Sequence, residues 1–342
     1  MLPVSVVVPA MNEAHNIVRL IHSLRAQTQP PAEIIVVDAG STDNTAHVAA
    51  QAGARVICTN RAYPGQARNI GIVHARYPII ACWDASMRAS ETALERLISP
   101  LLEGYADLVQ GYLEVVPQTF TSSLYLLLLV PPFVHRLQSG KKVCAHPVAC
   151  VAFRKDLWER VGGFRPWRAR EDSDFRQRVS YLHPRVVLAL DAISYWEPTE
   201  NWKAILKKVR LYGRHNLLSG EPRDWYGMLW RIYGFYGVLG LGSGLVGGAL
   251  VGLTVFGTAI LGGGIFRTLR KILQNAQVFA ERTGTSPYTL KVILSSTALL
   301  LSTDAASFLG WLDWLLLDKL GLKPERFPEP VVLGELSPSL SE

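Results

Sequence analysis

The chain has 342 residues, of which 18% are charged, and its formal net charge is +7. Its mean hydropathy of +0.17 is high for a wholly soluble protein of this size. This length accommodates one large domain or a domain with an appendage. Without a nucleic-acid-binding motif, the basic charge does not indicate DNA or RNA, and we expect no nucleic-acid partner. The four cysteines lack both metal-type spacing and the density of a disulfide framework, which indicates a reduced, cytosolic environment.

The first half of the chain alternates short apolar runs with amphipathic segments. The runs predict buried strands at 4–8, 34–38, 55–58 and 77–83, and the segments between them predict helices at 14–27, 44–51, 67–75 and 91–102. This alternation predicts an α/β fold with a mostly parallel, doubly wound sheet. Neither a G-x-G-x-x-G nor a P-loop motif is present, which disfavours a dinucleotide-binding dehydrogenase and a P-loop NTPase.

Acidic residues follow three of the predicted strands. Asp38 and Asp84 stand at the ends of two strands, and Glu13 lies just past the end of the first. Because the carboxyl ends of parallel strands line one crevice, we expect these carboxylates to lie near each other. Acids in such a crevice suit a bridging cation or the base and ribose of a nucleotide.

A second dense group of charges lies at residues 165–174, where three arginines precede Glu171, Asp172 and Asp174. One interpretation is a helix N-terminus with favourable acids in its first turn. The other is a catalytic acid group, and the local pattern leaves both open.

Five segments in order resemble the inverting family-2 glycosyltransferases of the GT-A fold. They are VVVPAMNEA, VVDAGSTDNT, PGQARNIGI, WDAS and GGFRPWRAREDSDF, and the resemblance covers about residues 4–181. It implies a GT-A catalytic domain over residues 1–200 and a hexosyltransferase activity. The implied donor is a nucleoside diphosphate sugar, with a UDP-sugar favoured.

The resemblance also implies roles for individual residues. Asp172 would be the catalytic base, with Glu171 beside it, and the donor would be bound by Pro9, Ala10, Glu13, Asp38, Arg68, Asn69 and Asp84. The chemistry agrees, because inverting transfer needs one base to take a proton from the acceptor hydroxyl. The leaving diphosphate needs positive charge, usually a divalent cation.

The sequence departs from the family at the D-x-D motif, which reads Asp84-Ala85-Ser86. The resemblance implies Mg²⁺ or Mn²⁺ held through Asp84 and Ser86, and Mg²⁺ tolerates one carboxylate with waters. Alternatively, Arg88 replaces part of the cation's charge, or a histidine such as His146 or His215 adds a ligand. The serine also leaves open a degenerate sugar-nucleotide-binding membrane subunit without turnover.

Residues 201–217 predict an amphipathic helix. Its basic residues recur on one continuous face, at Lys203, Lys207, Arg210 and Arg214. We expect this helix, within a segment of residues 201–231, to lie at the membrane surface near the acceptor. The alternative is a solvated charged face.

Residues 232–266 contain no charged residue and twelve glycines. The length predicts two membrane spans with a tight turn, 232–248 and 250–266, and a re-entrant pair is the competing interpretation. Gly240, Gly244, Gly248 and Gly252 predict close helix packing, within the chain or in a homo-oligomer. The flanks on both sides are basic, so we expect both ends on the cytoplasmic side.

Residues 292–317 are apolar but include Asp304 and Asp313, so this segment either spans the membrane or lies in its interface. The predicted membrane region is therefore 232–318, followed by a loosely ordered, proline-rich tail at 319–342. Together these patterns predict an integral protein of the cell membrane with a cytoplasmic catalytic domain. Its expected acceptor is a lipid or a lipid-linked saccharide.

Overall fold

The computed structural model describes residues 1–129, 149–198, 201–220, 222–324, 326 and 329–338. The chain forms two compact units. The sheet unit comprises Met1–Val116, Cys144–Glu197 and Arg326–Glu342, and the helical unit comprises Pro117–Val143 and Pro198–Glu325. Each unit has its own core and is described separately below.

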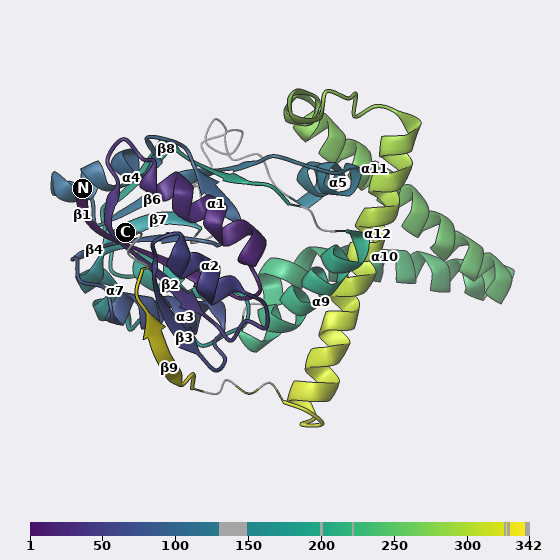
Figure 1. Ribbon diagram of the computed structural model, residues 1–342. Helices are drawn as coiled ribbons and strands as arrows, with labels where there is room; N and C mark the ends of the chain where they lie inside the picture. Colours follow the sequence, from purple (N-terminus) through teal and green to yellow (C-terminus); the bar gives the residue numbers. More distant parts are fainter. Residues whose placement is uncertain (130–148, 199–200, 221, 325, 327–328, 339–342) are drawn as a thin grey trace. The chain divides into compact units, whose positions relative to one another are not determined.

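The sheet unit is built on a nine-stranded sheet of order β5-β8-β6-β7-β4-β1-β2-β3-β9 (Figure 1). Its strands are β1 (Leu2–Ala10), β2 (Pro31–Asp38), β3 (Arg55–Thr59), β4 (Ile79–Trp83), β5 (Met87–Ala89), β6 (Leu108–Val115), β7 (Cys150–Arg154), β8 (Val186–Trp196) and β9 (Val332–Leu336). The strands β3, β2, β1 and β4 run parallel, whereas β7 runs antiparallel between β4 and β6. The predicted α/β fold with a mostly parallel sheet is therefore confirmed at its centre.

Helices cover both faces of this sheet, so its central strands are apolar on both sides. Val6 of β1 faces one core, beside α1 (Ala14–Arg25), α2 (Thr45–Gln51) and α4 (Ala93–Leu102). Its neighbour Val7 faces the other core, beside α3 (Pro64–Val73), α7 (Lys155–Val161) and α8 (Glu171–Ser180). Because successive side chains of a strand alternate between faces, the consecutive residues Val6, Val7 and Val8 contribute to both cores.

The C-terminal segment differs from the prediction of a loosely ordered tail. Val332–Leu336 forms strand β9, which pairs antiparallel with β3. Arg55 of β3 donates hydrogen bonds of 3.0 Å to both carboxylate oxygens of Glu335. The prediction was wrong here because β3 would otherwise be an edge strand with unpaired backbone groups, which a distant segment can satisfy.

The helical unit comprises α5 (Phe120–Leu129), α9 (Trp202–Leu218), α10 (Pro222–Gly247), α11 (Ala249–Thr283), α12 (Leu290–Asp313) and a π-helical turn, η1 (Trp314–Lys319). Its core joins Leu127 of α5, Ile205 of α9, Ile272 of α11 and Leu299 of α12. The buried Asn275 donates a 2.7 Å hydrogen bond to the carbonyl of Leu127. Residues 1–200 were expected to form one domain. Helix α5 lies within this range, but it packs against the helices of the helical unit.

The uncharged segment forms a helical hairpin, whose two arms lie side by side as the green pair in Figure 1. The arms α10 and α11 meet at Gly248, whose φ of 85° is a left-handed conformation that favours glycine. A Cβ on Gly252 would lie 2.6 Å from the carbonyl oxygen of Gly240 and 2.8 Å from the Cα of Gly244. The glycine spacing therefore serves packing within the chain.

Two helices of the described residues are long and apolar enough to cross a membrane, α11 and the stretch Leu290–Lys319. They suggest membrane association only weakly, because half of the apolar window in Leu290–Lys319 is buried. Asp304 in this stretch is also buried, and its carboxylate accepts hydrogen bonds from Tyr233 at 2.7 Å and from Arg267. Within the helical unit, Tyr233 of α10 and Arg267 of α11 therefore bind this buried acid.

Two of the four basic residues predicted to share one face of α9 are paired with acids. Lys203 and Lys207 are exposed, but Arg210 forms a 2.5 Å ion pair with Asp313, and Arg214 forms a 2.7 Å pair with Asp318. The acids that pair with Arg210 and Arg214 come from α12 and η1, about one hundred residues further along the chain. The residue spacing within α9 could not predict these partners.

Candidate active site

The predicted site begins at the edge of the sheet where β1, β2 and β4 end. Asp38 is the last residue of β2 and lies in register with Ala10 of β1, while Asp84 directly follows β4. Asp38 is buried, and its carboxylate accepts hydrogen bonds from the backbone N–H of Ser41 at 3.2 Å and from the Ser41 hydroxyl. Pro9 is half-buried beside it in β1. The structure thus brings these four predicted donor-binding residues to one edge of the sheet.

The loop after β1 is fixed by the loop after β2. The backbone N–H of Glu13 donates to the Thr45 hydroxyl at 2.8 Å, and the N–H of Ala14 donates to the Asp43 carboxylate at 3.3 Å. The Thr45 hydroxyl also donates to Asp43, and this bond lowers the pKa of the carboxyl below its usual value. The side chains of Thr45 and Asp43 therefore hold the backbone of Glu13 and Ala14 in place.

Arg68 is the centre of the charge arrangement. It projects from α3, its side chain is only 4% exposed, and its guanidinium lies 5.7 Å from the ring centroid of Phe164. It donates a 2.6 Å hydrogen bond to Asp84 and a 2.8 Å hydrogen bond to Glu171. One buried cation therefore joins the carboxylate after β4 to the carboxylate that begins α8.

The three acids of α8 have different surroundings. Glu171 is buried against Arg68, whereas Asp174 is held at 2.8 Å by Arg178 one turn further along. Asp172 is half-buried, and its carboxylate accepts a 2.7 Å hydrogen bond from the backbone N–H of Ser173. The acids therefore occupy a helix N-terminus, as one interpretation expects, and the role of Asp172 in catalysis stays a prediction.

The pKa of Glu171 is raised to about 7, first by burial and then by the neighbouring charge of Asp172. The hydrogen bond and charge of Arg68 act in the opposite direction. The residue before it, Arg170, has a left-handed backbone with φ of 70°, a conformation rarely adopted by residues other than glycine. A strained residue and a perturbed carboxyl together are typical of functional sites.

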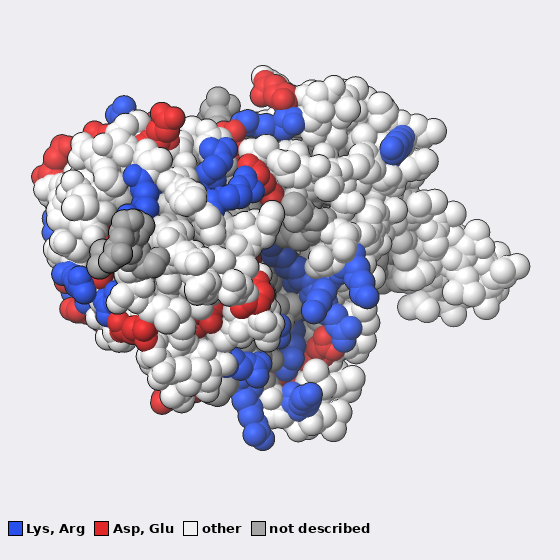
Figure 2. Space-filling model, viewed as in Figure 1, with Lys and Arg blue, Asp and Glu red and all other residues white. Residues whose placement is uncertain are grey.

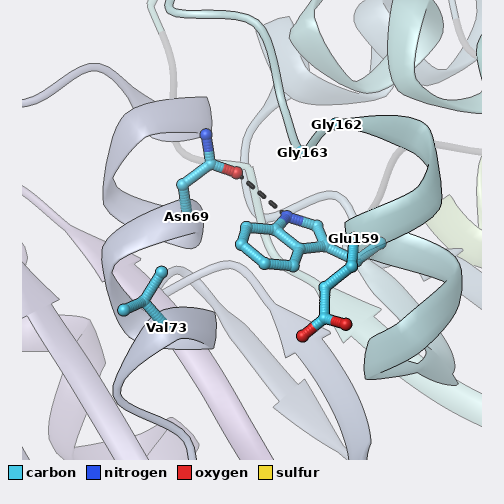
Figure 3. A pocket seen from close by; sticks show the side chains of 6 residues that line it. Asn69, Val73, Glu159, Gly162 and Gly163 are labelled. Atoms are coloured by element: carbon cyan, nitrogen blue, oxygen red, sulfur yellow. Dashed lines mark hydrogen bonds between the residues drawn. The ribbon is translucent and has the colours of Figure 1, made fainter.

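Asn69 has partners that differ from the predicted contact with a donor. Its amide nitrogen donates to the carbonyl of Phe164 at 2.9 Å. Its amide oxygen accepts from the N–H of Phe164 at 2.8 Å and from the indole of Trp158 at 3.0 Å (Figure 3). Through these hydrogen bonds, Asn69 holds the backbone at Phe164, in the segment before α8, in position.

A shallow pocket of about 420 Å³ lies beside these contacts. It is lined by Asn69, Val73, Trp158, Glu159, Gly162 and Gly163, and Figure 3 shows their arrangement. None of the acids at the sheet edge or at the start of α8 lines it. We therefore assign the candidate site to the sheet edge and to the start of α8, not to this pocket.

The D-x-D position forms a tight turn between β4 and β5, in which the carbonyl of Asp84 accepts from the N–H of Met87 at 3.1 Å. Asp84 and Ser86 are both half-exposed. Arg88, the alternative cation, lies over the ring of Tyr195 at 4.3 Å from its centroid and 4.0 Å from Glu197.

Among the described residues, no group of three or more His, Cys, Asp and Glu side chains could hold a metal ion. His215 is buried in α9, within the helical unit, and His146 lies outside the described residues. Of the ligands that the resemblance implies, the Asp84 carboxylate and the Ser86 hydroxyl stay predictions, and Asp84 also accepts a hydrogen bond from Arg68. This set suits a cation that takes most of its oxygens from a bound diphosphate and water, as Mg²⁺ does.

Comparison with known proteins agrees with the predicted class. Residues 5–162, just under half of the chain, match the glycosyl transferase family 2 model. An uncharacterized glycosyltransferase of Mycobacterium tuberculosis is 37% identical over 108 residues, which are 32% of this chain and 47% of that protein. The 4,4'-diaponeurosporenoate glycosyltransferase of Staphylococcus aureus is 35% identical over 129 residues, 35% of this chain and 33% of that protein. The chain thus spans less than half the length of these relatives.

The fold has a solved counterpart in the mannosyltransferase PcManGT from Pyrobaculum calidifontis, a structure in complex with GDP-Man and Mn²⁺. The TM-score is 0.56 at 17% identity, covering 92% of this chain and 87% of that one. The predicted GT-A fold is confirmed, and the relatives' names support the predicted enzyme class, a glycosyltransferase. Glu171 and Asp172 lie beyond the residues that match the family model.

Proposed function

We propose that this protein is an inverting glycosyltransferase that moves a sugar from a nucleoside diphosphate sugar, with a UDP-sugar favoured, to an acceptor hydroxyl. One observation carries the proposal. The buried guanidinium of Arg68 bonds both Asp84, at the nucleotide-binding edge of the sheet, and Glu171, next to the accessible Asp172. This arrangement fixes a carboxylate base beside the place where a diphosphate would lie.

In this mechanism Asp172 accepts the proton of the acceptor hydroxyl while the acceptor oxygen attacks the anomeric carbon. The new C–O bond forms as the bond to the diphosphate breaks, and the diphosphate leaves with the electron pair. Glu171 and Arg68 hold the start of α8 in position through their 2.8 Å hydrogen bond. Asp38, Glu13, Pro9 and Ala10 would contact the base and ribose, and we now assign Asn69 to positioning rather than to donor contact.

A divalent cation fits the site through Asp84, with Ser86 as a weaker ligand. Its chemistry would be to neutralise the charge of the leaving diphosphate. PcManGT was solved with Mn²⁺ and GDP-Man, which supports Mg²⁺ or Mn²⁺ as the cation for this chain. Because the protein supplies one carboxylate, we expect the cation to bind with the donor rather than before it.

The acceptor is proposed to be a lipid or a lipid-linked saccharide that is reached at the cytoplasmic face of the membrane. The apolar helices α11 and α12 support this location. The exposed Lys203 and Lys207 of α9 are the basic residues offered to anionic headgroups, since Arg210 and Arg214 are already paired with acids.

The test is release of the diphosphate from a panel of nucleoside diphosphate sugars by the purified full chain with membrane lipid extract. Each donor is assayed with Mg²⁺, with Mn²⁺ and with EDTA. We expect turnover of one donor class, and a loss of at least about 100-fold in the Asp172→Asn variant. The matched control is Asp156→Asn, because Asp156 is 62% exposed on α7 and pairs only with a surface arginine. Equal turnover by the Asp172 and Asp156 variants would overturn the assignment of the base.

A second candidate function is a sugar-nucleotide-binding membrane subunit without turnover. The serine at position 86 and the lack of a metal-ligating cluster among the described residues favour it. Donor binding without diphosphate release, even with lipid extract, would support this function. The Ser86→Asp variant would then be expected to gain cation-dependent turnover.

A further inference from the structure

The hairpin of α10 and α11 exposes large apolar side chains where its two helices meet. Leu245 is 90% exposed, Val246 is 93% exposed and Leu250 is 78% exposed, and all three flank the turn at Gly248. Further from the turn, Leu241 on α10 and Leu253 on α11 are 74% and 68% exposed. Such a surface is unstable in water, so something apolar must cover it.

Glycines line the contact between the two arms, and large apolar side chains lie on the outside. Gly240 and Gly244 of α10 meet Gly252 of α11, where a Cβ would collide with the opposite backbone. Gly263 packs in the same way against Tyr236, whose hydroxyl occupies the place of a Cβ. The surface used for close helix contact is therefore already filled, and the outer surface is irregular and bulky, as suits fluid acyl chains.

Charge is confined to the base of the hairpin. Arg231 precedes the uncharged part of α10, and Arg270 follows that of α11; both are exposed. Because the chain reverses at Gly248, these two residues lie at the same end. Figure 2 shows the projecting hairpin, at the right of the view, without a basic or acidic residue on the visible face. Basic residues at one end and apolar residues at the other match a headgroup layer and a hydrocarbon core.

The length of the arms decides how deep the hairpin reaches. Residues 232–247 and 249–266 are uncharged, and at 1.5 Å per residue they extend about 24 and 27 Å. A bilayer's hydrocarbon core is about 30 Å thick. The turn itself adds no polar loop, because the N–H of Gly248 donates to Gly244 at 2.9 Å and its carbonyl accepts from Gly252 at 3.1 Å. The non-helical interruption between α10 and α11 is one residue long.

We propose that residues 232–266 enter a lipid bilayer from one side and that the tip, residues 245–250, stays within the hydrocarbon. The proposal rests on the proposed membrane association and adds to it a one-sided, re-entrant insertion. A hairpin that spans the bilayer would instead place Leu245, Val246 and Leu250 in water on the far side. The bilayer is preferred to a second copy of this chain because large apolar side chains are exposed on both arms as well as at the tip, among them Leu241, Leu245 and Leu253.

The experiment uses the full chain in vesicles of phosphatidylcholine and phosphatidylglycerol. A bulky, membrane-impermeant maleimide is present on both sides of the bilayer, and its addition is read as a gel shift. Val246→Cys reports on the tip, and Leu273→Cys is the control, since Leu273 is 73% exposed on α11 beyond the basic residues. The parent chain gives the background of its own cysteines.

We expect Leu273→Cys to shift in vesicles and Val246→Cys to shift only after solubilisation in denaturing detergent. Labelling of Val246→Cys in intact vesicles would overturn the proposal and support a spanning hairpin. Protection that persists in mild detergent, together with crosslinking of Val246→Cys between chains, would overturn it in favour of a second copy.

Flotation of the vesicles separates this inference from the proposed location. A parent chain that does not float with the vesicles would refute membrane association as a whole. A parent chain that floats, combined with a labelled tip, would refute only the re-entrant insertion. As a second measurement, Val246→Arg is expected to lower the vesicle-bound fraction at least about tenfold, whereas Leu273→Arg is expected to leave it unchanged.

Discussion

The sheet unit and the helical unit place their charged and apolar groups in opposite ways. In the sheet unit apolar side chains fill two cores, and a buried arginine draws two carboxylates together at the site. In the hairpin of the helical unit, Gly240, Gly244 and Gly252 form the contact between the arms, and large apolar side chains lie outside. The contrast relates the two proposals to two kinds of surface: buried charge supports the proposed active site, and exposed apolar side chains support the proposed membrane insertion.

The largest effect is expected from removing the central cation of the sheet unit. The Arg68→Met variant keeps much of the side chain's volume but leaves Asp84 and Glu171 without their shared partner. Breaking a buried ion pair on one side costs about 3–5 kcal/mol of unfolding free energy, which denaturant unfolding in mild detergent would measure. The control is Arg96→Met, because Arg96 is 57% exposed and pairs at 3.4 Å with the exposed Asp191. A loss no larger than the control's would contradict the bridging role.

The interior of the hairpin provides the corresponding test in the helical unit. Gly252→Leu would force side-chain atoms into the backbone of Gly240 and Gly244, and we expect a loss of about 1–3 kcal/mol. Gly257→Leu is the matched control, since a Cβ at Gly257 meets no atom within 4 Å. Thermal unfolding of both variants in the same detergent would measure the difference. Equal melting temperatures would show that the two arms do not pack through their glycines.

The raised pKa of Glu171 predicts how stability depends on pH. A carboxyl whose pKa is about 7 in the folded state and 4.5 in the reference state binds its proton more tightly when folded. Its contribution to stability is therefore present at low pH and is lost as the pH rises from about 4.5 to about 7, by roughly 1–3 kcal/mol. Glu171→Gln cannot titrate, so we expect a flatter stability profile between pH 5 and pH 8. A variant profile parallel to the parent's would contradict the shift.

The smallest effect is expected at the edge of the sheet, where β9 joins β3. Glu335→Gln weakens the ion pair with Arg55, and the two side chains are 38% and 21% exposed. Partly exposed pairs contribute at most about 1 kcal/mol, so β9 should stay paired but exchange its backbone hydrogens faster. Hydrogen exchange over residues 332–336 would measure this, with the exposed Glu329→Gln as control. Complete loss of protection would mean that this ion pair alone holds β9.

Local patterns in the sequence determined much of the fold and part of the candidate site. The continuous apolar run of β2 predicted a strand buried on both faces, and Asp38 and Asp84 followed strands as expected. The absence of charge over residues 232–266 predicted two helices with a turn, and the turn lies at Gly248. Such features can be predicted from the sequence because they depend on residues that are close together along the chain. The periods of strands and helices, the residues of turns and the absence of charge are all local in this sense.

Only the tertiary structure decided which distant residues meet. Arg68 binds an acid 16 residues away and another 103 residues away, and Arg55 binds Glu335 across 280 residues. Sequence spacing identified Arg210 and Arg214 as one basic face, but acids from η1 and the end of α12 pair with both. The physical reason is that an ion pair needs only a complementary charge, and an added strand needs only free backbone groups. Many segments of the chain could supply either. Which of them is used depends on which segments the folded chain brings together.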